Sequence, residues 1–488
     1  MLEILVQISD LIWNPMAFMA LGVGFFFTVL TKGIQFRRFP DMIKSIFEKK
    51  SADDGGTSPL QAILLTIGGR VGVGNIAGVG TAISAGGPGA LFWMMLCSLL
   101  GAASAYAESV LAQVFKERAL NEHRGGMPYY VEKGLKLRWL AVVLATMTFV
   151  GYGFVFPGVQ ANSIAVSMDN AFGVSTWISA SVLTLVLGLV IWGGTQRIVH
   201  VAQVLVPIMA PGYLLAAFAI LVVNADQIWP TIVLVMSSAF GTNAVFGGIM
   251  GTAVAWGVRR SVFSNVAGVG EGTYVAASAS VRHPSKQGLA QALSIFVDTT
   301  LICSATGVMI IMTGMYNTPN PEGGFLYEGV PGMSAGPANT QAAIDTIMPG
   351  MGPGFLAVAL FFFAFTTMIA FFYIATTNLV FLGKGHPSPK LMFALKLGTL
   401  AITFFGCVAS AQTIWTIGDI GYGSIGWVNM ICILMLSPMV VKVTRDYDAQ
   451  MAAGKDPVFD PRPLGIENAD FWVAGDPIPE PRERVVDP

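Results

Sequence analysis

The chain is dominated by apolar runs long enough to cross a lipid bilayer, which restricts the folds open to it. A transmembrane helix needs about 20 consecutive, mostly apolar residues. Hydrophobic residues make up 54% of the 488 residues and charged ones 11%, so we exclude a soluble fold and predict an all-α, polytopic membrane protein. Eleven runs stand out, near 12–31, 58–83, 88–115, 139–168, 174–194, 200–223, 241–281, 288–314, 353–382, 391–410 and 412–441.

The basic residues between these runs indicate how the chain is oriented. All but four of the 27 Lys and Arg residues lie in alternate loops or in the C-terminal tail. Because such loops stay in the cytoplasm, we expect the C-terminus inside and the N-terminus outside, in a cell membrane, as in a bacterial inner membrane. No basic tract indicates a nucleic-acid partner, and the oligomeric state stays open.

One short motif occurs twice, in the second and the seventh run. Asn75-Ile-Ala-Gly-Val-Gly80 returns as Asn265-Val-Ala-Gly-Val-Gly270, and an arginine lies five residues before each Asn (Arg70 and Arg260). The copies are five spans apart, so the two helices cross the membrane in opposite directions. Glycine-broken segments at matching places in two inverted halves are typical of transporters whose substrate site lies between the repeats.

This duplication predicts four parts. They are an extra N-terminal span (1–31), a first five-helix repeat (57–224), a second five-helix repeat (241–441) and a mostly disordered cytoplasmic tail (442–488) that is rich in proline and charge. Eleven helices with a 5+5 inverted repeat follow. The outer loop from 315 to 352 is expected to contain a short cap helix near 338–348.

Glycines weaken the helix at both copies of the motif. Between 68 and 80 six glycines occur, each costing roughly 1 kcal/mol against alanine in a helix interior, and the seventh run is expected to break around 264–272. Freed carbonyls there bind a hard cation such as Na⁺, and the N-terminal ends of half-helices favour a carboxylate. The alternative is that the glycines only form close helix-packing seams.

The residues around both breaks resemble the signature of the alanine or glycine:cation symporter family, whose members have the leucine-transporter-type inverted-repeat fold. The resemblance covers spans 2 to 11 and implies Na⁺-coupled import of a small neutral amino acid. Matching positions include Gly72 to Val79, Gly86 to Trp93, Gln160 to Ser163, Arg260, Phe263 to Asn265, Phe296, Asp298, Thr299, Phe363 to Thr367 and Asp419.

The same resemblance implies a Na⁺ site beside the first break. It would join backbone carbonyls around Gly68 and Val71 to the hydroxyls of Thr366 and Thr367. The alternative is that each hydroxyl only bonds a carbonyl one turn back in its own helix.

The resemblance also implies a substrate site at the breaks. Backbone amides between Gly74 and Gly78 would hold the substrate carboxylate, and Gln160 and Asn162 would either bind its ammonium group or brace the second span. The full set of candidate substrate-binding residues is Gly74, Asn75, Ala77, Gly78, Gln160, Asn162, Asn265 and Gly268.

The chain departs from the family pattern at four places. Val266 stands where an acid is usual, and Glu271 begins a segment that is usually small residues and proline. The stretches 369–373 and 421–424 also differ. These departures leave the exact amino acid, its stereochemistry and the role of Glu271 open.

Ionisable residues within the runs are candidates for function because charge is costly in hydrocarbon. Asp298 is expected either to neutralise a cation or to hold the second broken helix. All four histidines lie in loops or at span edges, which favours Na⁺ over H⁺ as the coupling ion. H⁺ remains possible through Asp298 or Glu271.

Arginines flank both breaks and predict two gates. Arg260 or Arg259 would pair with Asp419 on the outer side, and Arg70 would pair with an inner acid such as Glu108, unless that acid is simply interfacial. Purely structural ion pairs are the alternative.

The sequence thus favours a secondary symporter that moves alanine or glycine inward with Na⁺ by alternating access. The same fold carrying another small solute, H⁺ coupling, and a passive channel are the alternatives. An enzyme is not expected, since the spans contain none of the common catalytic motifs.

Overall fold

The computed structural model describes residues 2–48 and 56–473 and is mostly helical. Within this part, eight helices are long and apolar enough to cross a membrane, or nine if one bent pair forms a single span. A shorter apolar helix, α10, covers Thr176–Ile191. The eight are α1 (Leu2–Leu30), α6 (Gly89–Val114), α8 with α9 (Arg138–Phe154 and Phe156–Phe172), α11 (Gly194–Val223), α15 to α16 (Pro284–Ile295, η4 Phe296–Cys303, Ser304–Thr313), α18 (Gly352–Leu382), α19 (Pro389–Val408) and α20 (Ala411–Met435).

Two helices are interrupted where the motif predicts breaks. The first is the bent pair: α4 (Pro59–Arg70) is followed by a π-helical turn, η1 (Gly74–Gly78), and by α5 (Val79–Gly86), with a bend of 50°. In the second, α13 (Met250–Asn265) and α14 (Glu271–Ser278) are separated by five residues. Val266, Gly268 and Gly270 between them have positive φ, a conformation that stops a right-handed helix.

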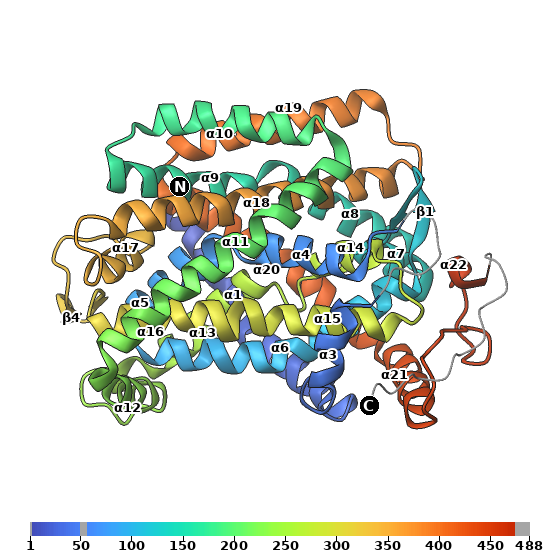
Figure 1. Cartoon of the computed structure of the whole chain (residues 1–488), viewed down its shortest axis with the longest axis horizontal. Coiled ribbons are helices and arrows are strands. Elements are labelled where there is room, and N and C mark those ends of the chain that lie inside the picture. The colour runs from blue at the N-terminus through green and yellow to red at the C-terminus, as the bar shows by residue number, and fades with distance from the viewer. Residues whose placement is uncertain (1, 49–55, 474–488) are drawn as a thin grey trace.

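The ends of the long helices form two faces (Figure 1). At the left of Figure 1 lie α12 (Ile228–Ala239), the β3–β4 hairpin (Asn317–Pro319, Phe325–Glu328) and α17 (Pro337–Asp345). We call this the cap face; α17 lies within the predicted cap-helix region, whereas the sequence did not predict α12.

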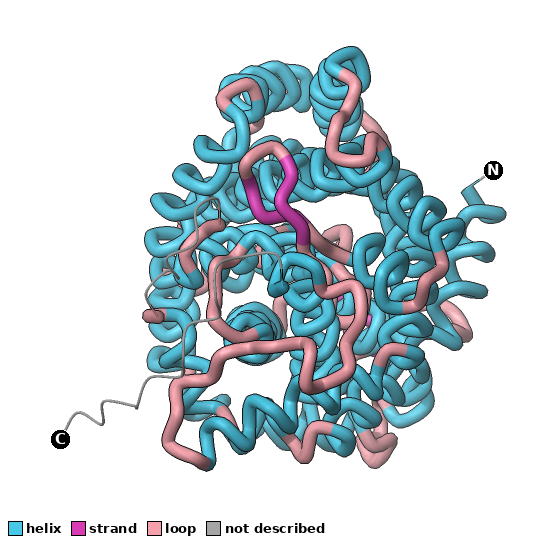
Figure 2. The backbone as a smooth tube through the Cα atoms, turned by 90° about the vertical axis from the view of Figure 1, so that its right-hand side faces the viewer, coloured by secondary structure: helices cyan, strands magenta, loops and turns pink. Residues whose placement is uncertain are grey.

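The right-hand end in Figure 1 is called the basic face, and Figure 2 looks onto it. Its small elements are α3 (Phe39–Ile46) with the preceding turn α2 (Ile34–Arg37), the β1–β2 hairpin (Glu117–Ala119, Glu122–Arg124), α7 (Met127–Gly134), α21 (Ser437–Ala452) and α22 (Asp470–Val473).

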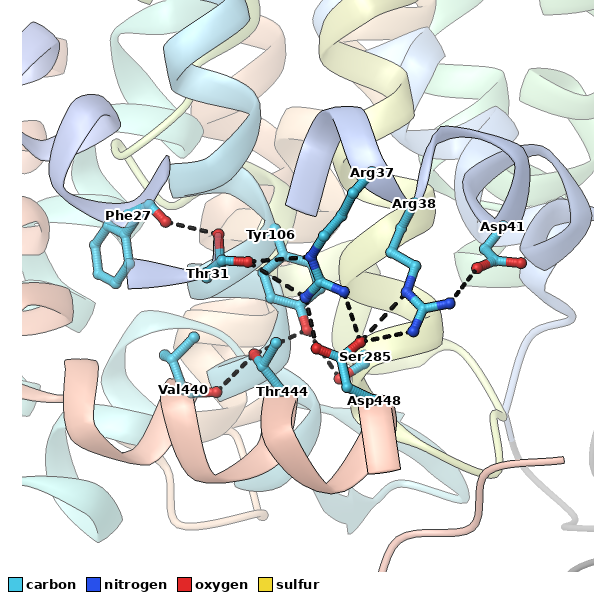
Figure 3. Close-up of polar contacts among 10 residues, drawn as sticks. All are labelled: Phe27, Thr31, Arg37, Arg38, Asp41, Tyr106, Ser285, Val440, Thr444 and Asp448. Atoms are coloured by element: carbon cyan, nitrogen blue, oxygen red, sulfur yellow. Dashed lines mark hydrogen bonds and ion pairs between the residues drawn. The ribbon is translucent and has the colours of Figure 1, made fainter. Parts of the chain in front are cut away.

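The prediction of a mostly disordered tail is wrong for residues 442–473. Helix α21 continues to Ala452, and Phe459 is fully buried. Asp448 on α21 accepts hydrogen bonds from Arg37 and Arg38 at 2.9 Å each (Figure 3). Hydropathy and charge missed these contacts because they depend on partners far away in sequence. Residues 474–488 lie outside the described part.

Candidate functional site

The two breaks pack directly against each other. A Cβ atom added to Gly74 in η1 would lie 2.9 Å from the Cα of Ser264 at the end of α13. Only glycine allows this approach, since real Cβ contacts are longer. The two copies of the motif therefore meet in space, as the inverted-repeat interpretation requires.

Asp298 on η4 connects the two breaks. Its Oδ1 accepts a hydrogen bond from Asn75 at 2.7 Å, and its Oδ2 accepts bonds from Ser264 at 3.0 Å and Thr299 at 2.7 Å. The carboxylate is fully buried. One buried carboxyl group thus holds both broken helices, where the sequence had offered either neutralising a cation or holding the second broken helix.

The two motif asparagines brace the backbone at their own breaks. Asn75 accepts a hydrogen bond from the Gly72 N–H at 2.8 Å, and Asn265 accepts one from the Ala267 N–H at 3.0 Å. Asn265 also donates to Thr299 at 3.2 Å. In this conformation both side chains form hydrogen bonds with other groups of the protein.

Gln160 and Asn162 on α9 have different surroundings. Gln160 accepts a hydrogen bond from the Val73 N–H at 3.2 Å and so braces the first break. Asn162 donates to the carbonyls of Gly406 and Ala409, each at 2.9 Å. Its Oδ1 is buried and has no hydrogen-bond partner among the described residues.

The four residues of the predicted Na⁺ site lie together. The Thr367 hydroxyl on α18 lies 3.1 Å from the Gly68 carbonyl oxygen, 3.4 Å from that of Val71 and 3.0 Å from that of Phe363. Thr366 lies against Gly68 and bonds the Phe363 carbonyl one turn back at 2.9 Å. Both threonines thus bond their own helix, and Thr367 also reaches the first break.

A cavity of about 1200 Å³ extends from the cap face toward the first break. Ala77 of η1 and Asn162 line it, together with Arg260, Trp415 and the loop 331–336 before α17. Gly78, next to Ala77, lies beneath the Arg260 side chain. A small solute entering from this side therefore has a path to the broken helix.

Charged groups line this cavity at α13 and α20. Asp419 pairs with Arg259 and Arg260 at 2.8 Å each, and the three side chains are nearly buried. Arg260 also lies over the rings of Trp256 and Trp415, at 5.2 and 5.0 Å. The predicted outer pair is thus formed, and it lies on the cap face.

The predicted pair of Arg70 and Glu108 is absent from the part of the chain that the structure describes. Arg70 donates to the Gln291 carbonyl at 3.1 Å and to Ser294. Glu108 is fully buried rather than interfacial and accepts from Asn429 at 3.1 Å. Asn429 also donates to the Gly268 carbonyl at 2.8 Å, which ties the second break to α20.

Some residues that form hydrogen bonds at the breaks were not predicted from the sequence. Ser264 precedes Asn265 in the second motif copy, so its position was the available signal. Tyr422 donates to Glu271 at 3.3 Å, and both lie in segments that depart from the family pattern. Hydropathy does not show that two such segments meet.

Two helices broken at matching motif copies, bonded to each other through one buried carboxylate and reached by a cavity, define a multi-pass membrane transporter. The model of the sodium:alanine symporter family matches residues 1–461. The chain belongs to this family. The family prediction is confirmed, and with it cation-coupled amino-acid symport with Na⁺ or H⁺ as the coupling ion.

Relatives in bacteria and archaea support this assignment. The putative sodium/proton-dependent alanine carrier protein YrbD of Bacillus subtilis is 47% identical over 97% of this chain and 98% of its own length. The probable sodium/glutamine symporter GlnT of the same species is 38% identical over 92% and 91%. The sodium/alanine symporter AgcS of Methanococcus maripaludis is 34% identical over 90% and 96%.

A solved structure gives a likeness of fold alone. A mutant of the manganese transporter of Eremococcus coleocola superposes with a TM-score of 0.51 at 11% identity, over 88% of this chain and 97% of that one.

Proposed function

We propose that the chain imports alanine or glycine together with Na⁺ by alternating access. In this proposal eleven spans form two inverted five-helix repeats after an extra first span, with the N-terminus outside and the C-terminus in the cytoplasm. The observation that carries it is the convergence of the Thr367 hydroxyl and the Gly68 and Val71 carbonyls beside two packed breaks. The names of the relatives YrbD and AgcS support alanine as the cargo.

Charge around the breaks favours a cation there. Arg70 is the guanidinium that interacts electrostatically with the carboxylates of Glu108, Asp298 and Glu271, all four being buried. If all are ionised, negative charge exceeds positive charge by two. Because such an excess is unfavourable away from water, Na⁺ bound by oxygens of Gly68, Val71, Thr366 and Thr367 would reduce it.

The substrate would bind where the cavity meets the first break. Backbone amides of Gly74 to Gly78 would hold its carboxylate. Asn162 lines the cavity, and its Oδ1, which has no hydrogen-bond partner among the described residues, is our choice for the ammonium group, whereas Gln160 keeps the backbone in place. Asn265 and Gly268 would shape the site from the second break.

Arg260 and Asp419 would form the outer gate, because their ion pair lines the route from the cap face. Replacing Arg260 by Ala should abolish or uncouple uptake. Wild-type transport kinetics in this variant would remove the gating role. Arg70 would act in the inner gate by exchanging its present hydrogen-bond partners, Gln291 and Ser294, for another group.

Uptake of radiolabelled alanine into proteoliposomes tests the cation site. Thr367→Val should raise the Na⁺ concentration for half-maximal uptake at least about tenfold, equivalent to ~1.4 kcal/mol. Thr403→Val is the matched control, since among the described residues this buried hydroxyl on α19 bonds only the Thr399 carbonyl one turn back. Equal Na⁺ dependence in the two variants would refute the site.

The same assay separates the alternatives. Saturable accumulation driven by a Na⁺ gradient supports the symporter. Accumulation driven by a pH gradient without Na⁺ would indicate H⁺ coupling, and unsaturable passive flux would indicate a channel.

A further inference from the structure

The C-terminal segment 455–473 crosses the basic face and contacts elements from both proposed repeats. We call it the C-terminal strap. At its start, Asp456 pairs with Arg282 and Lys286, and the Phe459 N–H donates to the Arg282 carbonyl at 2.9 Å. Arg282 lies just after α14 and Lys286 lies in α15, both in the proposed second repeat.

The far end of the strap reaches the first repeat. Glu467 pairs with Lys136 at 2.7 Å, and Asp470 pairs with Lys133 at 2.9 Å. The Asn468 side chain donates to the Lys133 carbonyl at 3.0 Å. The strap therefore connects α7 and its following loop to the segment after α14, across the face seen in Figure 2.

Lys116 is the central contact between the strap and a broken helix. Its ammonium donates to the Ala279 carbonyl at 2.9 Å, directly after α14. A cation at this end of a helix is favourable because the backbone dipole is negative there. Gln113 on α6 donates to the same carbonyl at 3.0 Å. The inner half of the second broken helix is thus held against α6.

Two aromatic rings of the strap cover Lys116 on its other side. The ammonium lies 4.3 Å from the ring centre of Phe471 and 5.1 Å from that of Trp472. Trp472 also donates to the Gln113 carbonyl at 3.0 Å. Lys116 is almost fully buried in consequence, and each ring attracts a cation over its face.

The contacts differ in strength. The pairs of Lys136 with Glu467 and of Lys133 with Asp470 involve acids that are 75% and 72% exposed, and such surface pairs contribute little. Phe459 is fully buried between His283 and Trp472, with ring centres 5.6 and 5.1 Å away. The aromatic residues therefore hold the strap in place.

We propose that the strap is an autoinhibitory lock on the basic-face gate, because it holds α14 and the first repeat together through Lys116. The inference rests on the proposed alternating access, in which α14 must part from α6 and α7 to open this face. Release of the strap would let Lys116 and α14 separate. The locked face agrees with a cavity that reaches the first break from the cap face.

The test compares the full chain with three variants in proteoliposomes. Truncation after Gly454 removes the strap, and Phe471→Ala with Trp472→Ala removes only the rings over Lys116. Truncation after Val473 is the matched control because it leaves every described contact of the strap. The full chain and the three variants all carry Ser278→Cys in a background without the four native cysteines. Ser278 lies at the end of α14, where its carbonyl bonds the Thr57 N–H.

Labelling of Cys at 278 by a soluble maleimide reports opening without any substrate. We expect at least threefold faster labelling in the strap truncation and the ring variant, and the full-chain rate in the control truncation. If the strap truncation does not fold, the ring variant decides. Unchanged labelling in the ring variant would overturn the lock, whereas failure of alanine uptake with faster labelling would count against the proposed cargo only.

Discussion

Asp298→Asn tests whether one carboxylate couples the two breaks. The asparagine has nearly the same shape, so the change removes charge and leaves the volume. Its remaining oxygen can face Asn75, but the new NH₂ group must then face Ser264 and Thr299, which now donate to Oδ2 at 3.0 and 2.7 Å. Both hydroxyls would have to turn and become acceptors.

The magnitude follows from the three hydrogen bonds. Bonds to a charged group contribute about 1.5–3 kcal/mol and neutral ones about 0.5–1.5, so Asp298→Asn should lose roughly 1 kcal/mol per bond. We expect the free energy of unfolding to decrease by about 2–4 kcal/mol in total. Asp298→Ala should lose more, because Asn75, Ser264 and Thr299 would each lose their carboxylate acceptor altogether.

Thermal unfolding in detergent and Na⁺-driven alanine uptake measure this effect. The unfolding temperature and the rate of alanine uptake should both fall clearly in Asp298→Asn. Thr300→Val is the matched control, since this hydroxyl on the same helix bonds Ser98 at 2.9 Å and, within residues 2–48 and 56–473, no residue of either break. Wild-type stability and uptake in Asp298→Asn, or equal losses in the control, would refute the argument.

Three further outcomes are expected. Gly74→Ala should abolish uptake because its Cβ would clash with Ser264, whereas Gly212→Ala, with no atom within 4 Å of the new Cβ, should transport normally; equal uptake would disprove the tight packing. Gln160→Leu should lower uptake by freeing the Val73 N–H, and normal kinetics would exclude this brace. Burial lowers the pKa of His283 on the basic face, although Asp446 opposes this. As the pH drops, His283 therefore takes up a proton in the unfolded chain before it does so in the folded one. The free energy of unfolding should accordingly decrease as the pH drops below about 6.5. His283→Asn should flatten that slope in thermal unfolding, and an unchanged slope would assign it to other groups.

The sequence could predict long apolar helices and both breaks because hydrophobic length and glycine content act locally, although it predicted eleven spans where the described residues contain eight such helices, or nine if the bent pair is one span. The run at 353–382 became α18 at Gly352–Leu382, and the break expected around 264–272 lies between Asn265 and Glu271. The short helix α12 was missed because it lies in a loop between two recognised runs.

Contacts between distant segments could not be predicted in the same way. Composition identified the tail as charged and proline-rich, which is typical of disorder, but three aromatic residues decide its position. Phe459 contacts His283 after α14, and Phe471 and Trp472 contact Lys116 and Gln113 at the end of α6, so these rings gain partners only when distant segments meet. Similarly, Arg70 and Glu108 lie within predicted spans, yet each bonds groups other than its predicted partner, and Glu108 is buried rather than interfacial.

The repeated motif also has unequal roles in its two copies. Asn75 accepts from an amide three residues before it, and Asn265 accepts from one two residues after it. This difference arises because the first break continues as a π-helical turn, whereas the second passes through Val266 at φ 51° and two left-handed glycines. Among the described residues, only the first break joins Thr367 and the cavity. Two nearly identical motif copies therefore predict where a helix opens, while the partners of each opening determine whether it binds a solute or supports its neighbour.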